Sequence, residues 1–272
     1  LIDLDVHGDN RGWFKENWQR EKLTELASEL ASFQPVQNNI SYNHAGATRG
    51  LHAEPWDKLV SVAQGKIFGA WCDLREGSES FGEVVTHEVG PETAVFVPRG
   101  VANGFQALEE TSYCYLVNEH WSAEARYSAV NLNIVDWPLA PTEISEKDKQ
   151  HPALKDVSPM PARRILVTGA NGQLGRALKR LLADAEFCTH AEFDITNPPA
   201  RNWKQYSAII NCAAYNDVNG AESDRAAAWA VNAEGPAKLA RIAAENQITL
   251  VHVSSDYIFD GANEVHTEEE LP

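Results

Sequence analysis

Cysteine is scarce in this 272-residue chain, and its spacing excludes the usual zinc and redox motifs. The four cysteines are Cys72, Cys114, Cys188 and Cys212, and no two of them form a Cys-x-x-Cys pair. Scattered cysteines of this kind are typical of free, buried thiols in a reducing compartment. We therefore expect a cytoplasmic protein without a cysteine-based metal site.

Long apolar runs and an excess of positive charge are also absent. No run approaches the roughly 20 apolar residues that a membrane span needs, and the first residues carry no signal-peptide pattern. Lys and Arg number 23 against 39 Asp and Glu, which gives a net charge of −16. An acidic chain repels phosphate backbones, so we expect neither a membrane nor a nucleic acid as a partner.

The patterning predicts two domains of different class. Residues 1–137 carry short β-rich runs separated by Gly/Pro turns, which predict a β-sandwich or barrel of the jelly-roll type. Residues 138–163 contain five prolines and few apolar residues, a composition typical of a linker. From residue 164 the pattern is strand–helix–strand, and leucines at helical spacing over 174–182 predict an amphipathic helix. We predict a first domain over 1–157 and an α/β domain over 163–272.

A glycine motif opens the second domain. Gly169, Gly172 and Gly175 follow an apolar strand-like run at 164–168. Such a turn brings the backbone close to a pyrophosphate at a helix N-terminus, although three glycines alone can also form a simple tight turn. Asp194 lies about 20 residues further on, where an acidic group often contacts the cofactor, but it could also cap a turn. The strand before the glycines and the helix after them favour a dinucleotide site.

His52 is the reactive-looking residue of the first domain. Metal sites on jelly-roll strands need two histidines on one strand face, and His52-Ala53-Glu54 offers only one. The sequence therefore disfavours a metal here. A catalytic base and a lone core histidine remain the two interpretations.

Further motifs accompany the glycines in the second domain. They are Asn-Cys-Ala-Ala-Tyr at 211–215, Val-Asn at 231–232 and Ser-Ser-Asp-Tyr-Ile-Phe-Asp-Gly at 254–261. From about residue 164 to the end the chain resembles the dTDP-4-dehydrorhamnose reductases of the extended short-chain dehydrogenase superfamily, a Rossmann fold. The resemblance implies NADH or NADPH as the cofactor, held by Gly169, Gly172, Gln173, Leu174, Gly175, Asp194, Ala213, Ala214 and Asn232.

The resemblance also implies that Ser255 is the hydroxyl member of a Ser/Thr–Tyr–Lys catalytic set. The alternative is a strand-end serine that bonds the backbone. The Tyr-x-x-x-Lys of that family does not occur up to Pro272. We expect the reductase domain to be truncated at its C-terminus, and both ends of the natural protein to lie outside this sequence.

A second series of motifs runs through the first domain, at 9–16, 36–39, 49–52, 58–60, 73–75, 80–82, 104–105 and 136–138. Across residues 1–154 this series resembles the dTDP-4-dehydrorhamnose 3,5-epimerases. The resemblance implies a cupin-like jelly roll, a homodimer formed through this domain, a dTDP-sugar substrate and no cofactor for the epimerase half.

The same resemblance assigns roles. His52 is implied as the general base, Asp148 as the carboxylate that orients it, Lys58 as the cation near the developing oxyanion and Tyr115 as the acid on the other face. Substrate contacts are implied at Arg11, Glu16, Gln37, Asn39 and Arg49. The alternatives are a core tyrosine for Tyr115 and solvated surface charges for Lys58 and the arginines.

Two positions depart from the family pattern. Many members have a histidine where this chain has Asn103, which we expect to line the sugar pocket and to tune the activity without abolishing it. A Tyr-Tyr pair is replaced by His120-Trp121, which still offers a surface on which a base can stack.

The two halves resemble consecutive steps of dTDP-L-rhamnose synthesis. We therefore predict a bifunctional enzyme that epimerises dTDP-4-dehydro-6-deoxyglucose at C3 and C5 and then reduces the 4-keto group with NAD(P)H. The alternative is a non-catalytic sugar-nucleotide-binding or regulatory protein with degenerate domains. Asn103 and the missing Tyr-x-x-x-Lys would suit that alternative.

Overall fold

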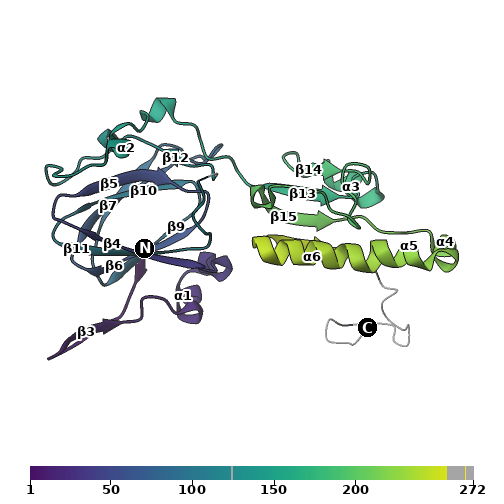
Figure 1. Ribbon diagram of the computed structural model, residues 1–272, viewed down its shortest axis with the longest axis horizontal. Coiled ribbons are helices and arrows are strands. Elements are labelled where there is room, and N and C mark those ends of the chain that lie inside the picture. The colour runs from purple at the N-terminus through teal and green to yellow at the C-terminus, as the bar shows by residue number, and fades with distance from the viewer. Residues whose placement is uncertain (124, 256–266, 268–272) are drawn as a thin grey trace. The chain divides into compact units, whose positions relative to one another are not determined.

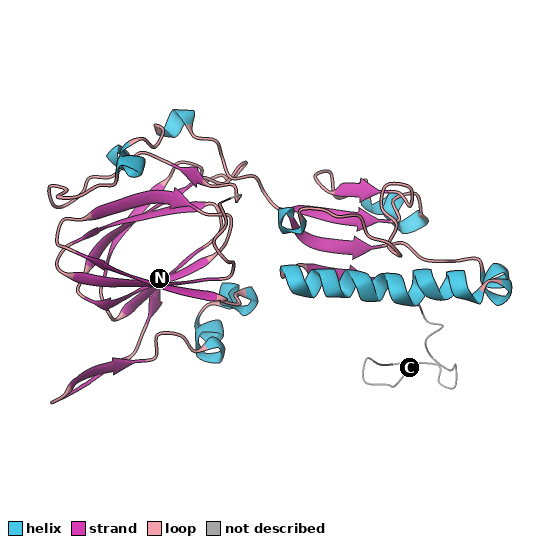
Figure 2. Cartoon of the chain, viewed as in Figure 1, coloured by secondary structure: helices cyan, strands magenta, loops and turns pink. Residues whose placement is uncertain are grey.

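The computed structural model of the chain describes residues 1–123, 125–255 and 267. It divides into two compact units, Leu1–Ala162 and Arg163–Pro272, which differ in class (Figures 1 and 2). The first unit is built almost entirely of strands, and the second alternates strands with helices. Among the described residues, no helix is both long and apolar enough to cross a membrane.

Two five-stranded antiparallel sheets form the first unit. One sheet has the order β1 (Ile2–Asp3), β9 (Thr93–Val97), β6 (Lys58–Gln64), β11 (Thr111–Val117) and β4 (Gln37–Asn43). The other has the order β12 (Ser128–Ala129), β5 (Thr48–Ala53), β10 (Val101–Ala107), β7 (Ile67–Asp73) and β8 (Val84–Val89). The predicted β-sandwich is confirmed.

Apolar side chains cover both faces of the sheets. Val60 and Val62 of β6 meet Trp71 of β7 and Phe105 of β10 between the two sheets. The outer face of the second sheet is covered in turn by the C-terminal part of the unit. Because strands buried on both faces need apolar residues at successive positions, β6 and β7 read as nearly continuous apolar runs in the sequence.

Residues 138–162 belong to the first unit and pack on the sandwich, although their composition is typical of a linker. They include α2 (Glu146–Lys149) and the 3-10 helix η3 (Leu154–Asp156). The side-chain amide of Gln106 donates to Leu139 O (2.9 Å) and accepts from Leu139 N (2.8 Å), and Met160 N–H donates to Leu74 O (2.7 Å). The prolines restrict φ to values that suit an extended segment across the sheet, and we call residues 138–162 the strap.

An N-terminal hairpin and a helical segment complete the unit. The helical elements are α1 (Arg20–Leu26) and the 3-10 helices η1 (Ser28–Ser32) and η2 (Leu132–Ile134). Leu23, Leu30 and Phe33 cover the outer face of the first sheet. The hairpin of β2 (Val6–Asp9) and β3 (Gly12–Lys15) extends away from the sandwich (Figure 1).

The second unit contains a four-stranded parallel sheet of Rossmann-like character. The strand order is β14 (Glu186–Cys188), β13 (Arg164–Thr168), β15 (Tyr206–Asn211) and β16 (Thr249–His252). Its helical elements are α3 (Gln173–Leu178), η4 (Trp203–Gln205), α4 (Val218–Ser223), α5 (Arg225–Trp229), the π-helix η5 (Ala230–Glu234) and α6 (Gly235–Asn246). Leu239 and Ala243 of α6 pack with Leu166 and Ile209 of the sheet.

The helix predicted over 174–182 is shorter than its periodicity suggested. The helix α3 ends at Leu178, and Leu181 is largely exposed.

Met160 tests whether the C-terminal strap stabilises the sandwich. Its side chain is 1% exposed and belongs to the cluster of Leu51, Ala70 and Leu74. Met160→Ala should lower the free energy of unfolding of the first unit by about 2–5 kcal/mol, because it leaves a cavity. Urea unfolding can be followed by tryptophan fluorescence, because six of the eight tryptophans of the chain lie in this unit. Lys155→Ala, an exposed change in the same strap, is the control. A loss below about 1 kcal/mol for Met160→Ala would show that the strap does not stabilise the sandwich.

Candidate active site

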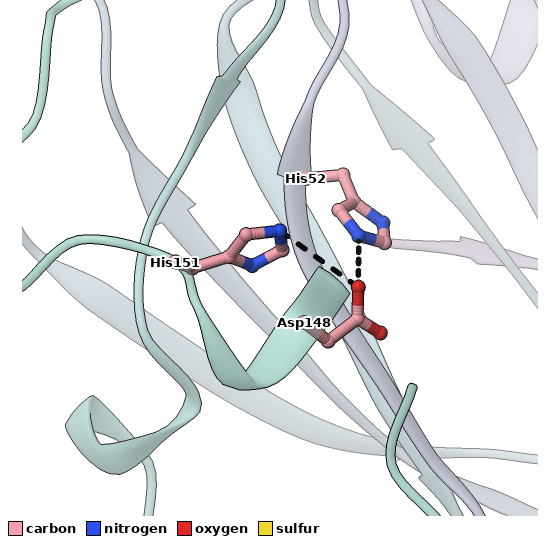
Figure 3. A group of neighbouring side chains, drawn as sticks. All are labelled: His52, Asp148 and His151. Carbon is pink, nitrogen blue, oxygen red and sulfur yellow. Dashed lines mark hydrogen bonds and ion pairs between the residues drawn. The ribbon is translucent and has the colours of Figure 1, made fainter. Parts of the chain in front are cut away.

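A histidine–aspartate pair joins the second sheet to the strap. Nε2 of His52, on β5, lies 2.7 Å from Oδ1 of Asp148, on α2 (Figure 3). The other carboxylate oxygen, Oδ2, accepts the Gly50 N–H at 3.2 Å. Ser145 caps α2 by accepting the Asp148 N–H on its Oγ (3.1 Å). The short helix therefore presents the carboxylate to the histidine in a fixed position.

The environment of Asp148 fixes which nitrogen of His52 carries the proton. Burial opposes ionisation of Asp148, but the hydrogen bonds from His52 and Gly50 outweigh it and hold the pKa of this carboxyl below its usual value. An ionised carboxylate only accepts hydrogen bonds, so His52 Nε2 carries the proton and donates it. In the neutral ring Nδ1 then has the lone pair, which makes it the nitrogen that can act as a base.

Gly50 allows β5 and β10 to approach each other beside the pair. It has φ +121°, and a Cβ at this position would lie 2.5 Å from Gly104 Cα. Only glycine tolerates both the backbone conformation and the close contact. The resulting register places Asn103 opposite His52.

A buried lysine forms the second charged group of the site. Lys58 of β6 forms an ion pair with Glu54 and donates to Asn103 Oδ1 at 2.9 Å. Asn103 in turn donates from Nδ2 to Tyr113 Oη at 3.0 Å. An ammonium group has three donors, and the described part of the chain engages two of them, which leaves one for a ligand.

Two tyrosines of β11 complete this network. Tyr115 lies under Lys58, with Nζ 5.3 Å from the ring centroid. Burial, and then the charge of Glu54, raise the pKa of Tyr115, while Arg49 opposes the rise. Tyr113 is fully buried and stacks on Phe105, and burial raises its pKa far above the usual value. Both phenols are therefore protonated near neutral pH.

These groups line one cavity of about 510 Å³. Six of the residues predicted from the sequence line it: Arg49, His52, Lys58, Asn103, Tyr115 and Asp148. Gln37 and Asn39 are not in the wall itself, but the register places Asn39 opposite Tyr115 and Gln37 opposite Val117. Both amides therefore continue the polar face of the sheet beyond the cavity.

Arg11 and Glu16 do not line this cavity, and their predicted contact with a substrate stays a prediction. Arg11 pairs with Asp9 at the tip of the β2–β3 hairpin, and its side chain is 89% exposed. Glu16 follows β3 and pairs with Lys22. The hairpin extends away from the sandwich and carries Arg11 with it (Figure 1).

Three site residues were missed by the sequence analysis. Glu54 was considered only as one part of an incomplete metal motif, yet it is the counter-ion of Lys58. Tyr113 was not distinguished from the apolar part of its strand. His151 lies beside the pair, with its ring centroid 5.0 Å from that of His52 (Figure 3). Its position three residues after Asp148, at helical spacing, was the available signal.

The glycine turn of the second unit fits a dinucleotide. Gly169 has φ +68°, and a Cβ there would lie 2.6 Å from Ala213 N. A Cβ on Gly175 would lie 2.5 Å from Gly169 O, so these two glycines pack strand, turn and helix together. Gly172 is the exposed N-cap of α3, and a Cβ added to it would have only Gly169 O within 4 Å. Its surface is open to a ligand, as are the neighbouring Gln173 and Leu174.

Other predicted cofactor residues make structural contacts. Asp194 Oδ1 accepts both the N–H and the hydroxyl of Thr196 at 2.8 Å, which is the turn-capping alternative. Asn232 clamps the backbone of Tyr215 through both ends of its amide. Ala213 and Ala214 follow the end of β15, and Ser255 lies exposed after β16. The rest of the motif at 254–261, which includes Tyr257, lies outside the described residues.

The fold and site define the first unit as a jelly-roll protein with a histidine held by an aspartate and a buried lysine in one cavity. Residues 1–156 match the dTDP-4-dehydrorhamnose 3,5-epimerase family, and the chain belongs to it. A protein named RmlC homolog from Streptococcus pyogenes serotype M6 is 51% identical over 170 residues, which cover 58% of this chain and 86% of that protein. RmlC of Streptococcus suis, solved with dTDP-D-xylose, has 48% identity and a TM-score of 0.54, covering 58% of this chain and 87% of that one.

The second unit has its own relatives. Residues 163–272 match the RmlD substrate binding domain. The dTDP-4-dehydrorhamnose reductase of Mycobacterium tuberculosis is 48% identical over 106 residues, which are 37% of this chain. The match spans 35% of that reductase, about a third of its length. The two resemblances found in the sequence are confirmed at the level of family.

The Lys58–Glu54 pair generates a prediction about stability. Both side chains are largely buried, at 8% and 15% exposed. Glu54→Leu should cost about 3–5 kcal/mol of unfolding free energy because it leaves a buried cation unpaired, whereas Glu54→Leu with Lys58→Met should recover most of that loss. Chemical unfolding of the wild type, the two single variants and the double variant measures the coupling energy of the pair. Glu88→Leu, in the exposed pair with Lys66, should cost less than about 1 kcal/mol. Additive losses for Glu54 and Lys58 would contradict the account.

Proposed function

We propose that the first unit epimerises dTDP-4-dehydro-6-deoxyglucose at C3 and C5, and that the second unit is part of an NAD(P)H-dependent reductase of the epimerised 4-ketone. The His52–Asp148 pair at 2.7 Å, opening on the same cavity as Lys58 and Tyr115, supports the first half most directly. The family match of residues 1–156 supports the substrate class.

His52 is the base of this reaction. A C–H next to a ketone is weakly acidic, so its removal needs both a positioned base and a group that stabilises the enolate. Nδ1 of His52 takes the proton, and the C–H electron pair becomes the enolate. The imidazolium that forms is stabilised by ionised Asp148 on the opposite nitrogen.

Lys58 supplies the stabilisation of the enolate. Its ammonium is held by Glu54 and Asn103, which leaves one N–H for the ketone oxygen. A preorganised donor aimed at a developing oxyanion lowers the activation free energy by about 2.7–4 kcal/mol. Asn103 thus acts on the oxyanion through the position of Lys58.

Tyr115 returns a proton to the other face of the sugar. Burial raises its pKa, so the phenol is protonated and can donate when the enolate carbon approaches. Transfer leaves a phenolate, which the ammonium of Lys58, 5.3 Å from the ring centroid, stabilises until solvent restores the proton. Removal from one face and delivery to the other inverts the carbon.

The nucleotide end of the substrate extends from the cavity along β4. Arg49 lines the cavity and can grip diphosphate oxygens two at a time. Gln37 Oε1 accepts the backbone N–H of Trp121 at 3.4 Å, and the indole of Trp121 is exposed. A thymine base can stack on Trp121 and bond those amides.

We place Arg11 and Glu16 in the cavity of a second copy. The hairpin that carries them also exposes Trp13 and Phe14, at 47% and 64%. Burial of these aromatic rings on a partner would offset the cost of exposing them to water. A homodimer formed through the first unit would then complete each substrate site with Arg11 of the other chain.

The second unit holds the dinucleotide on its glycine turn. The exposed Gly172 lets the pyrophosphate approach the backbone, and Ala213, Ala214 and Asn232 border the carboxyl ends of the strands, where such ligands bind. The bound nicotinamide would supply a hydride to the 4-ketone. Ser255, beyond the end of β16, would bond the ketone oxygen, and a separate acid must protonate the alkoxide.

His52 and Asp148 should act as one unit. His52→Ala should abolish incorporation of solvent deuterium at C3 and C5 of the sugar, because no other base takes its place. Asp148→Asn should slow incorporation by up to about 10⁴-fold, since it disturbs the tautomer of the imidazole. Mass spectrometry of the recovered sugar nucleotide in heavy water measures both, with Asp156→Asn as the exposed control. Near-normal exchange in His52→Ala would refute the assignment of the base, whereas absence of exchange in the wild-type protein would favour a non-catalytic binding role.

Asn103 should tune the reaction. Asn103→Ala removes the acceptor of Lys58 and the donor to Tyr113, so we expect turnover to fall about tenfold, which equals about 1.4 kcal/mol. Asn103→His restores an acceptor nitrogen and should keep or raise turnover. Unchanged exchange and sugar affinity in Asn103→Ala would remove this residue from the mechanism.

Gly172 should report the cofactor site. An added methyl meets only Gly169 O, at 3.2 Å, so Gly172→Ala should leave the fold intact and yet hinder the pyrophosphate. We expect at least about tenfold weaker NADPH binding by calorimetry. Gly175→Ala, which would clash with backbone, should instead lower the stability of the second unit. Equal NADPH affinity in wild type and Gly172→Ala would argue against this site.

A further inference from the structure

His151 is a buried histidine that the proposed mechanism does not use. Its side chain is only 7% exposed, and neither ring nitrogen has a hydrogen-bond partner of normal geometry among the residues that the structure describes. Leaving a buried polar group unpaired is costly, so such a group in a native structure calls for an explanation. Its Nε2 lies 3.8 Å from Asp148 Oδ1, and its ring meets His52 edge to face at 82° (Figure 3).

We propose that His52, Asp148 and His151 form a binding site for Zn²⁺ or a similar borderline divalent cation, and that occupancy of this site inhibits the enzyme. Each residue offers one ligand atom, and these atoms all lie within 4.8 Å of one another. Two imidazoles and one carboxylate are a ligand set that zinc prefers, with a fourth position open to water.

The distances suit a small adjustment around a metal. Zinc binds nitrogen and oxygen at about 2.0–2.2 Å, so tetrahedral ligands lie roughly 3.3–3.6 Å apart. The distance from Asp148 Oδ1 is 2.7 Å to His52 Nε2 and 3.8 Å to His151 Nε2. These two values bracket the required one. All three ligand atoms lie within 4.8 Å of one another, so binding would require the two imidazole rings to move toward a common centre.

The charge state of the three groups also favours a cation. A neutral imidazole offers a nitrogen lone pair, and neither ring nitrogen of His151 has a hydrogen-bond partner among the described residues. Asp148 is ionised and supplies the negative charge. The cation reaches the site through the cavity, which His52 and Asp148 both line.

Inhibition follows from the tautomer of His52. Coordination takes the lone pair of Nε2, so the single proton of the neutral ring moves to Nδ1. That is the nitrogen that must accept the substrate proton. The metal-bound enzyme therefore has no base, and the effect should reverse when a chelator removes the cation. The predicted inhibition rests on the proposed epimerase function, whereas metal binding itself does not.

The test combines direct binding with inhibition, on the full chain. Chelator-treated protein is titrated with Co²⁺, whose visible absorption is intense in tetrahedral N/O sites, and with Zn²⁺ against a competing chromophoric chelator. Deuterium incorporation into the sugar is then measured across Zn²⁺ concentrations. We expect one equivalent of bound metal, full inhibition and recovery with EDTA.

Matched variants locate the site. His151→Phe keeps an aromatic ring against His52 but removes the ligand. Because loss of even an outer hydrogen-bond partner of a metal costs about 10–100-fold in affinity, we expect the zinc concentration for half-inhibition to rise at least about 100-fold relative to wild type. His44→Phe removes an exposed histidine that also pairs with a carboxylate, that of Glu110, and should leave zinc inhibition unchanged.

A second substitution guards against a folding defect in His151→Phe. His151→Cys retains a ligand and should keep zinc sensitivity, with an added thiolate-to-cobalt absorption band. Equal zinc sensitivity in wild type and His151→Phe, or absence of Co²⁺ absorption in the wild type, would overturn the metal site. Absence of exchange in metal-free wild-type protein would instead count against the proposed function, while the Co²⁺ titration would still decide the metal site.

Discussion

The hydrogen bond between His52 and Asp148 is the contact on which the site depends. It joins β5 to a helix 96 residues later in the chain, and the buried carboxylate keeps its charge only because His52 and Gly50 donate to it. A hydrogen bond to a charged group contributes about 1.5–3 kcal/mol, and a buried charge left without its partners costs more. The same contact orients the base and fastens the strap, so function and local stability are coupled.

The remainder of the cavity is a second, connected electrostatic arrangement. Lys58 is a buried cation that the fold tolerates because Glu54 and Asn103 satisfy it, and Asn103 is held in turn by Tyr113. The chain thus keeps two opposite charges in the lining of one cavity, ionised Asp148 beside His52 and the ammonium of Lys58 beside Asn103. This separation is what a proton transfer next to a carbonyl needs, because positive charge must develop on one side and negative charge on the other.

Much of this could be predicted from the sequence, and the failures have physical causes. The sandwich followed from apolar runs between Gly/Pro turns, and His52, Lys58, Tyr115 and Asp148 followed from motif resemblance. The strap has the composition of a linker because composition reports local backbone preference, whereas the burial of Met160 is a tertiary contact that composition does not show. That Arg11 does not line the cavity could not be predicted, because a motif gives no information on the path of a hairpin. Glu54 was missed because its role depends on Lys58, four residues on across a turn, and no single-residue pattern shows such a pair.

The central claim is that Asp148 holds His52 in the tautomer with the proton on Nε2 and the lone pair on Nδ1. Long-range ¹H–¹⁵N NMR of the imidazole, recorded near neutral pH on protein freed of metal, observes this directly. The account predicts a protonated Nε2 and an unprotonated Nδ1 for His52, with the preference lost in Asp148→Asn. A proton on Nδ1 in the wild-type protein, or a tautomer ratio that Asp148→Asn leaves unchanged, would contradict it.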